Sequence, residues 1–185
     1  MGWNEVEKSN NNEKKNEYTK FPVGATMIRI LDDEPYSFWQ HWLNNQRTSV
    51  TCLGKDCPIC NIINAARQNK EKSPYTNQHR HAMRVWNYTT NQQEIMIQSK
   101  GFMSNMLTLH KEIGDLRTYD VKVIRSGEGK ETTYTLLPTS PSEFEFKDRI
   151  EDVDFEEVFK APTREEMLQL IEGKTWAEIR GTDAA

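Results

Sequence analysis

The sequence predicts a mainly β protein built around one core. Alternating apolar and polar runs recur between residues 21 and 139, and residues typical of turns separate them. A chain of 185 residues, 36% of them hydrophobic, is long enough for one such domain with appendages and short for two. No apolar run approaches membrane-spanning length, and the polar start lacks the features of a secretory signal, so we expect a cytosolic protein.

β-branched and aromatic residues are frequent in the predicted strands. The first strand follows the turn residues Pro22 and Gly24, and the second is rich in aromatic rings. The other four strands form two predicted hairpins, joined through TTNQQ and GEGK. The six predicted segments are residues 25–33, 35–43, 81–88, 94–99, 118–126 and 131–139.

A helix is predicted between the two hairpins, over residues 101–115. Its apolar stripe recurs at steps of three and four residues and consists of Phe102, Met106, Leu109 and Ile113, with Gly114 at its end.

The order of these elements matches an OB-fold barrel, which has five strands and a helix between the third and the fourth. The match requires the hairpin over residues 81–99 to count as one long bent strand. We therefore predict an OB-fold-like five-stranded barrel over residues 21–139, with an insertion at about 44–78. A polar arm, residues 1–20, precedes this core.

An acidic segment with short helices is predicted over residues 140–185. Thr163 with Glu166, and Thr175 with Glu178, have the spacing of capping boxes, which begin helices. Residues 127–185 carry 15 acidic and 7 basic side chains, whereas residues 21–126 carry 9 acidic and 13 basic ones. A mildly basic core suits a polyanionic ligand, although an unevenly charged solvated surface explains the same pattern.

All three cysteines lie in TCLGKDCPIC, with the spacing Cys52-x4-Cys57-x2-Cys60. Two thiolates separated by two residues can bind one tetrahedral metal from a single turn, and Gly54 and Pro58 suit such a turn. Zinc is the commonest tetrahedral partner of thiolates in a reducing cytosol. The spacing therefore predicts a structural zinc site in the insertion.

A closed zinc site needs a fourth ligand, for which the four histidines are candidates. We favour His41, because its predicted strand would run directly into the cysteine segment. His79 and His81 are alternatives, and His110 lies in the predicted helix as a solvated residue. With four protein ligands no position stays open for water, so the metal would act as a staple.

Two other interpretations of the cysteines are weaker. A redox pair of Cys57 and Cys60 should open a helix after a βαβ-type strand, but the preceding segment is polar and rich in turn residues. Zinc deaminases carry H-x-E before P-C-x-x-C. Here His110-Lys111-Glu112 follows the cysteines, and Asp56 precedes Cys57.

Single-stranded nucleic acid is the ligand that residues 82–88 predict. Alternation there places Arg84, Trp86 and Tyr88 on one side of the strand, opposite an aliphatic side. If the aliphatic side is core, a cation and two rings face solvent, and such rings stack on unpaired bases at about 1–3 kcal/mol each. Strand tryptophans are also frequent core residues. Other residues that would widen the surface are Arg29, Trp39, Trp42, Arg47, Lys55, Lys100, Lys122 and Arg125.

The segments FPVGATMIRILDDEP, HWL, CLGKDCPIC and MRVWNYTTNQQEIMIQSKGF together resemble the single-stranded-DNA-binding proteins of tailed bacteriophages. These are distant relatives of the T-even phage helix-destabilising protein, a zinc-bearing OB-fold that coats replicating DNA. The resemblance covers about residues 18–137, and the array of one histidine and three cysteines is its most specific part.

The resemblance implies zinc on four ligands, single-stranded DNA in a basic aromatic cleft, and no catalysis. It further implies replication or recombination proteins as partners and the cytoplasm of the bacterial host as location. Leu53 stands where family members often have proline, and the acid lies at residues 143–157 instead of the extreme C-terminus, which weakens the case for tail-mediated recruitment. The zinc ligands implied are His41, Cys52, Cys57 and Cys60.

Three other classes of function are alternatives to DNA binding. The second hypothesis is a zinc-stapled adaptor that binds a host or phage protein, and the net charge of −4 and the acidic C-terminal segment support it. A double-stranded DNA reader lacks a basic recognition helix. An enzyme is the weakest hypothesis, because the carboxylates cluster without histidine partners and no phosphate-binding loop or nucleophile elbow is present.

Overall fold

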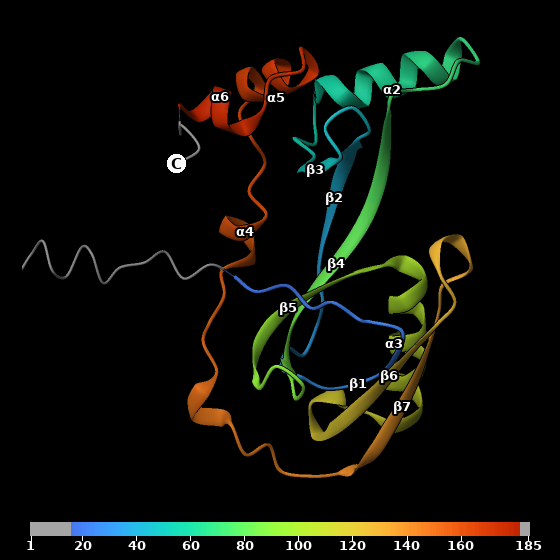
Figure 1. Cartoon of the computed structure of the whole chain (residues 1–185), viewed down its shortest axis with the longest axis vertical. Helices are drawn as coiled ribbons and strands as arrows, with labels where there is room; N and C mark the ends of the chain where they lie inside the picture. The colour runs from blue at the N-terminus through green and yellow to red at the C-terminus, as the bar shows by residue number, and fades with distance from the viewer. Residues whose placement is uncertain (1–15, 182–185) are drawn as a thin grey trace, which may run out of the picture. The chain divides into compact units, whose positions relative to one another are not determined.

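The computed structural model describes residues 16–181 (Figure 1). Most of the predicted polar arm therefore lies outside the described residues. The chain divides into two compact units. Within the described range, the first unit takes residues 16–34, 83–97 and 105–151, and the second takes residues 35–82, 98–104 and 152–181.

The described residues form seven strands and five α-helices. The strands are β1 (Gly24–Ile30), β2 (Tyr36–Leu43), β3 (Thr48–Thr51), β4 (Tyr75–Asn87), β5 (Gln92–Ser99), β6 (Tyr119–Ser126) and β7 (Thr133–Pro141). The helices are α2 (Pro58–Gln68), α3 (Lys100–Ile113), α4 (Phe155–Val158), α5 (Arg164–Ile171) and α6 (Trp176–Arg180).

The strands pair in the order β3-β2-β4-β1-β6-β7, and β5 pairs with β4. The mainly β class is thus confirmed, as are both predicted hairpins and the helix between them. Six strand segments were predicted and counted as five barrel strands, whereas residues 16–181 contain seven strands. The pairings among the described residues do not close the sheet into a barrel. β3 escaped prediction because its four residues are too short and too polar to show an alternating pattern.

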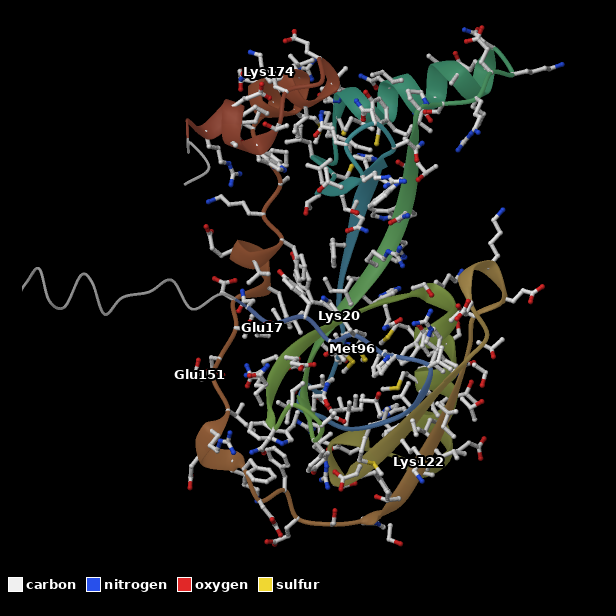
Figure 2. All side chains as sticks on the ribbon, viewed as in Figure 1. Glu17, Lys20, Met96, Lys122, Glu151 and Lys174 are labelled. Carbon is white, nitrogen blue, oxygen red and sulfur yellow. The ribbon has the colours of Figure 1, made fainter. Side chains whose placement is uncertain are left out.

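The first unit buries the inner face of its strands. Ile28, Val85 and Val121 are fully buried there, as expected from alternation along each strand. The register aligns Ile28 with Asn87 on β4 and with Val121 on β6. Figure 2 labels Met96 among the buried side chains of this unit and Lys122 on its outside.

The outer face of the same strands is also covered. Arg29 pairs with Trp86 across β1 and β4, and both residues are only 1% exposed. The cover comes from the segment after β7, residues 142–151, which we call the strap. The strap contains the short 3-10 helix Lys147–Arg149.

The second unit is organised around the ribbon formed by β2 and the first eight residues of β4. The register runs from Tyr36 opposite Ala82 to Leu43 opposite Tyr75, and β3 lies on the other edge of β2. The expected insertion ended near residue 78, but β4 begins at Tyr75, because its polar first half is a paired strand.

Three helices pack against one end of this ribbon. Pro58 occupies the first turn of α2, where proline costs no hydrogen bond. Both predicted capping boxes are present, at Thr163 for α5 and at Thr175 for α6. Figure 1 shows α5 and α6 beside α2. The buried cluster that they share consists of Leu43, Val50, Cys57, Ile59, Ile63, Tyr75, Met167 and Leu170.

No helix within residues 16–181 has the length and apolar character needed to cross a bilayer.

Candidate metal centre and aromatic surfaces

Four side chains of the second unit converge on one point. His41 lies in β2, Cys52 follows β3, Cys57 caps the N-terminus of α2, and Cys60 lies in the first turn of that helix. Their ligand atoms all lie within 4.8 Å of one another. The structure therefore brings His41, and neither His79 nor His81, to the three cysteines.

The spacing of these atoms fits a tetrahedral metal. The Cys52 and Cys60 sulfurs are 3.6 Å apart, and His41 Nε2 lies 3.3 Å from the Cys57 sulfur and 3.8 Å from the Cys60 sulfur. A tetrahedral zinc with bonds of about 2.0–2.3 Å separates its ligands by roughly 3.5–3.8 Å. The four residues could hold such an ion without a large rearrangement.

The chain between Cys52 and Cys57 makes the turn that a metal site requires. Gly54 has φ +80°, a left-handed conformation that favours glycine, and its backbone N–H donates to the Cys52 sulfur at 3.3 Å. Asp56 also has a positive φ of 58°. The two left-handed residues turn the chain back, so that Cys57 follows Cys52 to the same site.

Asn77 fixes the orientation of the histidine. Its Oδ1 lies 2.7 Å from His41 Nδ1, so this ring nitrogen donates the hydrogen bond and Nε2 keeps its lone pair toward the sulfurs. His41 is 1% exposed. Burial lowers the pKa of His41, partly offset by the Asn77 hydrogen bond, which favours the neutral ring that a metal needs.

The pKa values of two of the thiols are shifted upward, opposite to that of His41. Burial raises the pKa of Cys52, partly offset by hydrogen bonds from Gly54 and with Cys60. Burial also raises the pKa of Cys60 to about 12, and there both neighbouring thiols add to the rise. Without a cation these thiols stay protonated at neutral pH. A bound cation would stabilise the thiolates and displace their protons.

Met167 closes the buried side of the cluster. Its thioether sulfur lies 3.5 Å from the Cys57 sulfur, and Met167 is fully buried. Arg164, at the start of the same helix, donates to the Asp56 carbonyl at 2.7 Å. The predicted C-terminal helices are therefore part of the fold around the candidate metal centre.

The stripe predicted on β4 lies on one face, as expected, but solvent does not reach its central ring. The Phe146 ring lies flat on the Trp86 indole, with 4.8 Å between centroids and 10° between planes. The Arg149 guanidinium lies 4.6 Å from the centre of the same indole. The expectation of an open Trp86 is therefore wrong, because the alternation of a strand gives the side of a residue and not what covers it.

The two neighbours of Trp86 on the stripe are half-buried. Tyr88 donates its hydroxyl hydrogen to Asp120 at 2.7 Å. Burial, followed by the interaction with Asp120, raises the pKa of Tyr88 to about 12. Arg84 forms an ion pair with Asp32 at 2.8 Å. Arg29 is buried and bound to Asp120 at 2.6 Å.

The other predicted nucleic-acid contacts are spread over both units. Trp39 is 52% exposed, whereas Trp42 is half-buried on the opposite face of the ribbon. In the first unit, Arg125 donates to the Phe21 carbonyl at 2.9 Å. The exposed cations among the predicted residues are Arg47, Lys55, Lys100 and Lys122.

Trp39 belongs to a group of rings that we call the platform: Trp39, His79 and His81. His79 stacks on Trp39 at 4.6 Å and 16°, and His81 lies 4.5 Å from His79. The Ser37 hydroxyl is hydrogen-bonded to His81 Nδ1 at 2.8 Å. Trp39 and His41 are two residues apart in β2, so the platform shares a face of the ribbon with the candidate metal ligand.

Three groups of residues were not predicted to contribute. Met167 follows the predicted capping box at Thr163, but nothing near it in the sequence connects it with the cysteines. His79 and His81 were considered only as metal ligands. Phe144 and Phe146 alternate with glutamates in EFEF, a pattern that indicates an extended segment with one buried face.

Comparison with known proteins found no matching family model, no matching curated protein and no matching solved structure.

Proposed function

We propose that this protein binds single-stranded DNA without sequence preference and protects it during phage replication or recombination. The observation that carries the proposal is the exposed Trp39 indole, stacked on His79. A large ring that is stacked on a second ring and still about half exposed can accept an unpaired base by stacking. An indole that served only the core would be covered.

The pairing in the first unit supports an OB-like assignment. β1 pairs with β4 and β6, β5 pairs with β4, and β7 pairs with β6. Counting only the part of β4 in this unit, these are five strands with α3 between the third and the fourth. In this assignment residues 83–87 correspond to the second OB strand, and residues 35–82 correspond to an enlarged loop between the first and second OB strands.

This assignment agrees with the placement of the predicted contacts. OB-folds bind oligonucleotides on their second and third strands and on the loop that follows the first strand. Trp86 lies in the second strand, and Trp39 lies in the enlarged loop. In this proposal zinc at His41 and the three cysteines shapes that loop and takes no part in chemistry.

The test is a titration of the zinc-loaded protein with oligo-dT, followed by tryptophan fluorescence. We expect quenching that weakens steeply between 50 and 200 mM salt, because displaced counterions are part of the binding free energy. Duplex DNA and an RNA of the same length serve as comparison ligands. No quenching by any single strand at low salt would contradict the proposal.

A zinc-stapled adaptor for a host or phage protein is the second candidate. The observation that favours it is Leu168, an apolar side chain 42% exposed on α5 within the acidic C-terminal segment. The adaptor predicts a protein partner that survives nuclease treatment, together with no affinity for oligo-dT.

A further inference from the structure

The strap makes a set of contacts with the outer face of the first unit that resembles recognition of a single strand. Rings meet rings in its middle: Phe146 stacks on Trp86, and Phe144 meets the same indole edge-on at 5.8 Å. Tyr88 meets Phe146 edge-on at 6.3 Å. The two faces of this contact are flat and aromatic, as in base stacking.

Arginines hold acceptor atoms at both ends of the strap. Arg29 donates to the Ser142 carbonyl at 3.1 Å and to the Ser142 hydroxyl at 2.6 Å. Arg84 donates to the Glu151 carbonyl at 2.8 Å. A guanidinium that binds a carbonyl can bind a phosphate oxygen with the same donors, and more strongly because the phosphate is charged.

A polar side chain of β5 and a backbone carbonyl of the turn before it complete the contact. Gln93 donates to the Glu151 carbonyl at 2.9 Å and accepts from the Glu151 N–H at 2.9 Å. Arg149 donates to the Asn91 carbonyl at 2.8 Å. Figure 1 shows the strap between the end of β7 and α4, and Figure 2 labels Glu151 at its end.

The strap carries a net negative charge, as a nucleic-acid strand does. Residues 143–151 contain four carboxylates and two basic side chains. Glu143, Glu145 and Asp148 are exposed. The first unit therefore presents two arginines and two rings of its outer face to a segment that is itself aromatic and acidic. The residues are Arg29, Arg84, Trp86 and Tyr88.

We propose that residues 142–151 occupy a second single-strand-binding surface, formed by Arg29, Arg84, Trp86 and Tyr88, and that single-stranded nucleic acid displaces them. This inference rests on the proposed function and extends it. The site of Trp39 is open in the protein alone, whereas the second surface becomes available only when the strap leaves. The apparent affinity of the second surface therefore equals its intrinsic affinity multiplied by the fraction of molecules in which the strap is open.

Hydrogen exchange on the intact zinc-loaded protein tests this displacement directly. The Glu151 amide is protected by Gln93 in the closed form. With saturating oligo-dT, amides of residues 143–151 should exchange about tenfold faster or more, as expected for a shift from closed to open molecules. Helix α5, residues 164–171, is the internal reference and should not change.

A pair of variants tests the competition. Phe146→Ala removes the ring that covers Trp86, and if about a tenth of the wild-type molecules are open, oligo-dT should bind about tenfold more tightly. Phe155→Ala is the matched control, because Phe155 is also half-buried and stacked, at 5.6 Å on Tyr36, but belongs to α4. Its affinity for oligo-dT should stay unchanged.

Each outcome separates this proposal from the proposed function. If oligo-dT binds, while strap exchange stays slow and Phe146→Ala binds no tighter, the strap is a permanent wall and only this inference is wrong. If neither the wild type nor Phe146→Ala binds any single strand at low salt, the proposed function fails and this inference with it. Should Phe146→Ala fail to fold, the exchange measurement on the wild type still decides.

Discussion

The thioether sulfur of Met167 lies 3.5 Å from the thiol sulfur of Cys57, although 110 residues separate them in the chain. This contact joins a helix of the acidic C-terminal segment to the candidate metal centre. The same helix also accepts a hydrogen bond at the Leu170 carbonyl from the Gln46 side chain at 2.9 Å. The C-terminal helices are therefore expected to depend on the integrity of the metal centre.

Truncating Met167 should destabilise the zinc-loaded protein strongly. Met167→Ala leaves a cavity beside Cys57, and such losses of buried apolar side chains cost about 2–5 kcal/mol. Leu168→Ala is the control on the same helix, because Leu168 is 42% exposed and should change stability by about 0.5 kcal/mol or less. Urea unfolding measures both. Equal effects of the two substitutions would show that α5 is not packed as described.

Removal of the metal should loosen two segments that are distant in the sequence. Zinc analysis should give about one ion per chain, and Cys57→Ser should lose it, whereas Lys55→Ser in the same turn should retain it. Because Met167 packs on the cysteines, chelation should make residues 163–181 as well as the 52–68 segment sensitive to protease. A metal-free protein that resists protease as well as the loaded one would rule out a structural role.

Zinc affinity should rise with pH. The raised pKa values of Cys52 and Cys60 mean that both thiols carry protons at neutral pH, and zinc must displace them. Affinity should therefore increase about tenfold per pH unit for each proton released. The lowered pKa of His41 keeps its ring neutral, so protons compete with zinc for this imidazole only in acid. Competition with a chelator at pH 6, 7 and 8 measures the slope, and an affinity independent of pH would argue against thiolate ligands.

Trp39 should matter for binding much more than for stability. If a base stacks on its indole, Trp39→Ala should remove about 1–3 kcal/mol of binding free energy, or roughly 5- to 150-fold in affinity for oligo-dT. The control is Leu107→Ala, since Leu107 is also 52% exposed but lies on α3. Fluorescence anisotropy of labelled oligo-dT measures both variants. An unchanged affinity for Trp39→Ala would remove the platform from the binding site.

Local patterns in the sequence predicted much of the architecture. The strands and helix of the first unit follow from periodicity, and the two capping boxes follow from side chains three residues apart. The cysteines with His41 could be predicted because thiolate spacing restricts the geometry of a metal site. Each of these depends on residues close in the chain or on a strong chemical preference.

The covering of the strands could not be predicted in the same way. Alternation placed Trp86 correctly on the side of β4 opposite Val85, but the side became buried because Phe146, 60 residues later, packs on it. The reverse holds for Trp39, which shares a face with buried His41 and still remains half-exposed. Contacts between distant segments decide which side of a strand meets solvent, and no periodicity within one strand reports them.

β4 is one unbroken strand of 13 residues, from Tyr75 to Asn87, and it contributes to both units. The alternation of side chains along this strand is therefore shared by both units. His79 and Val85 are six residues apart and lie on the same face of β4: His79 is paired with Trp39, and Val85 is buried in the first unit. A single residue inserted between Ala82 and Met83 would shift the phase on one side of the insertion. If one unit keeps its original register, the other must either turn its apolar side chains toward solvent or lose its strand pairing.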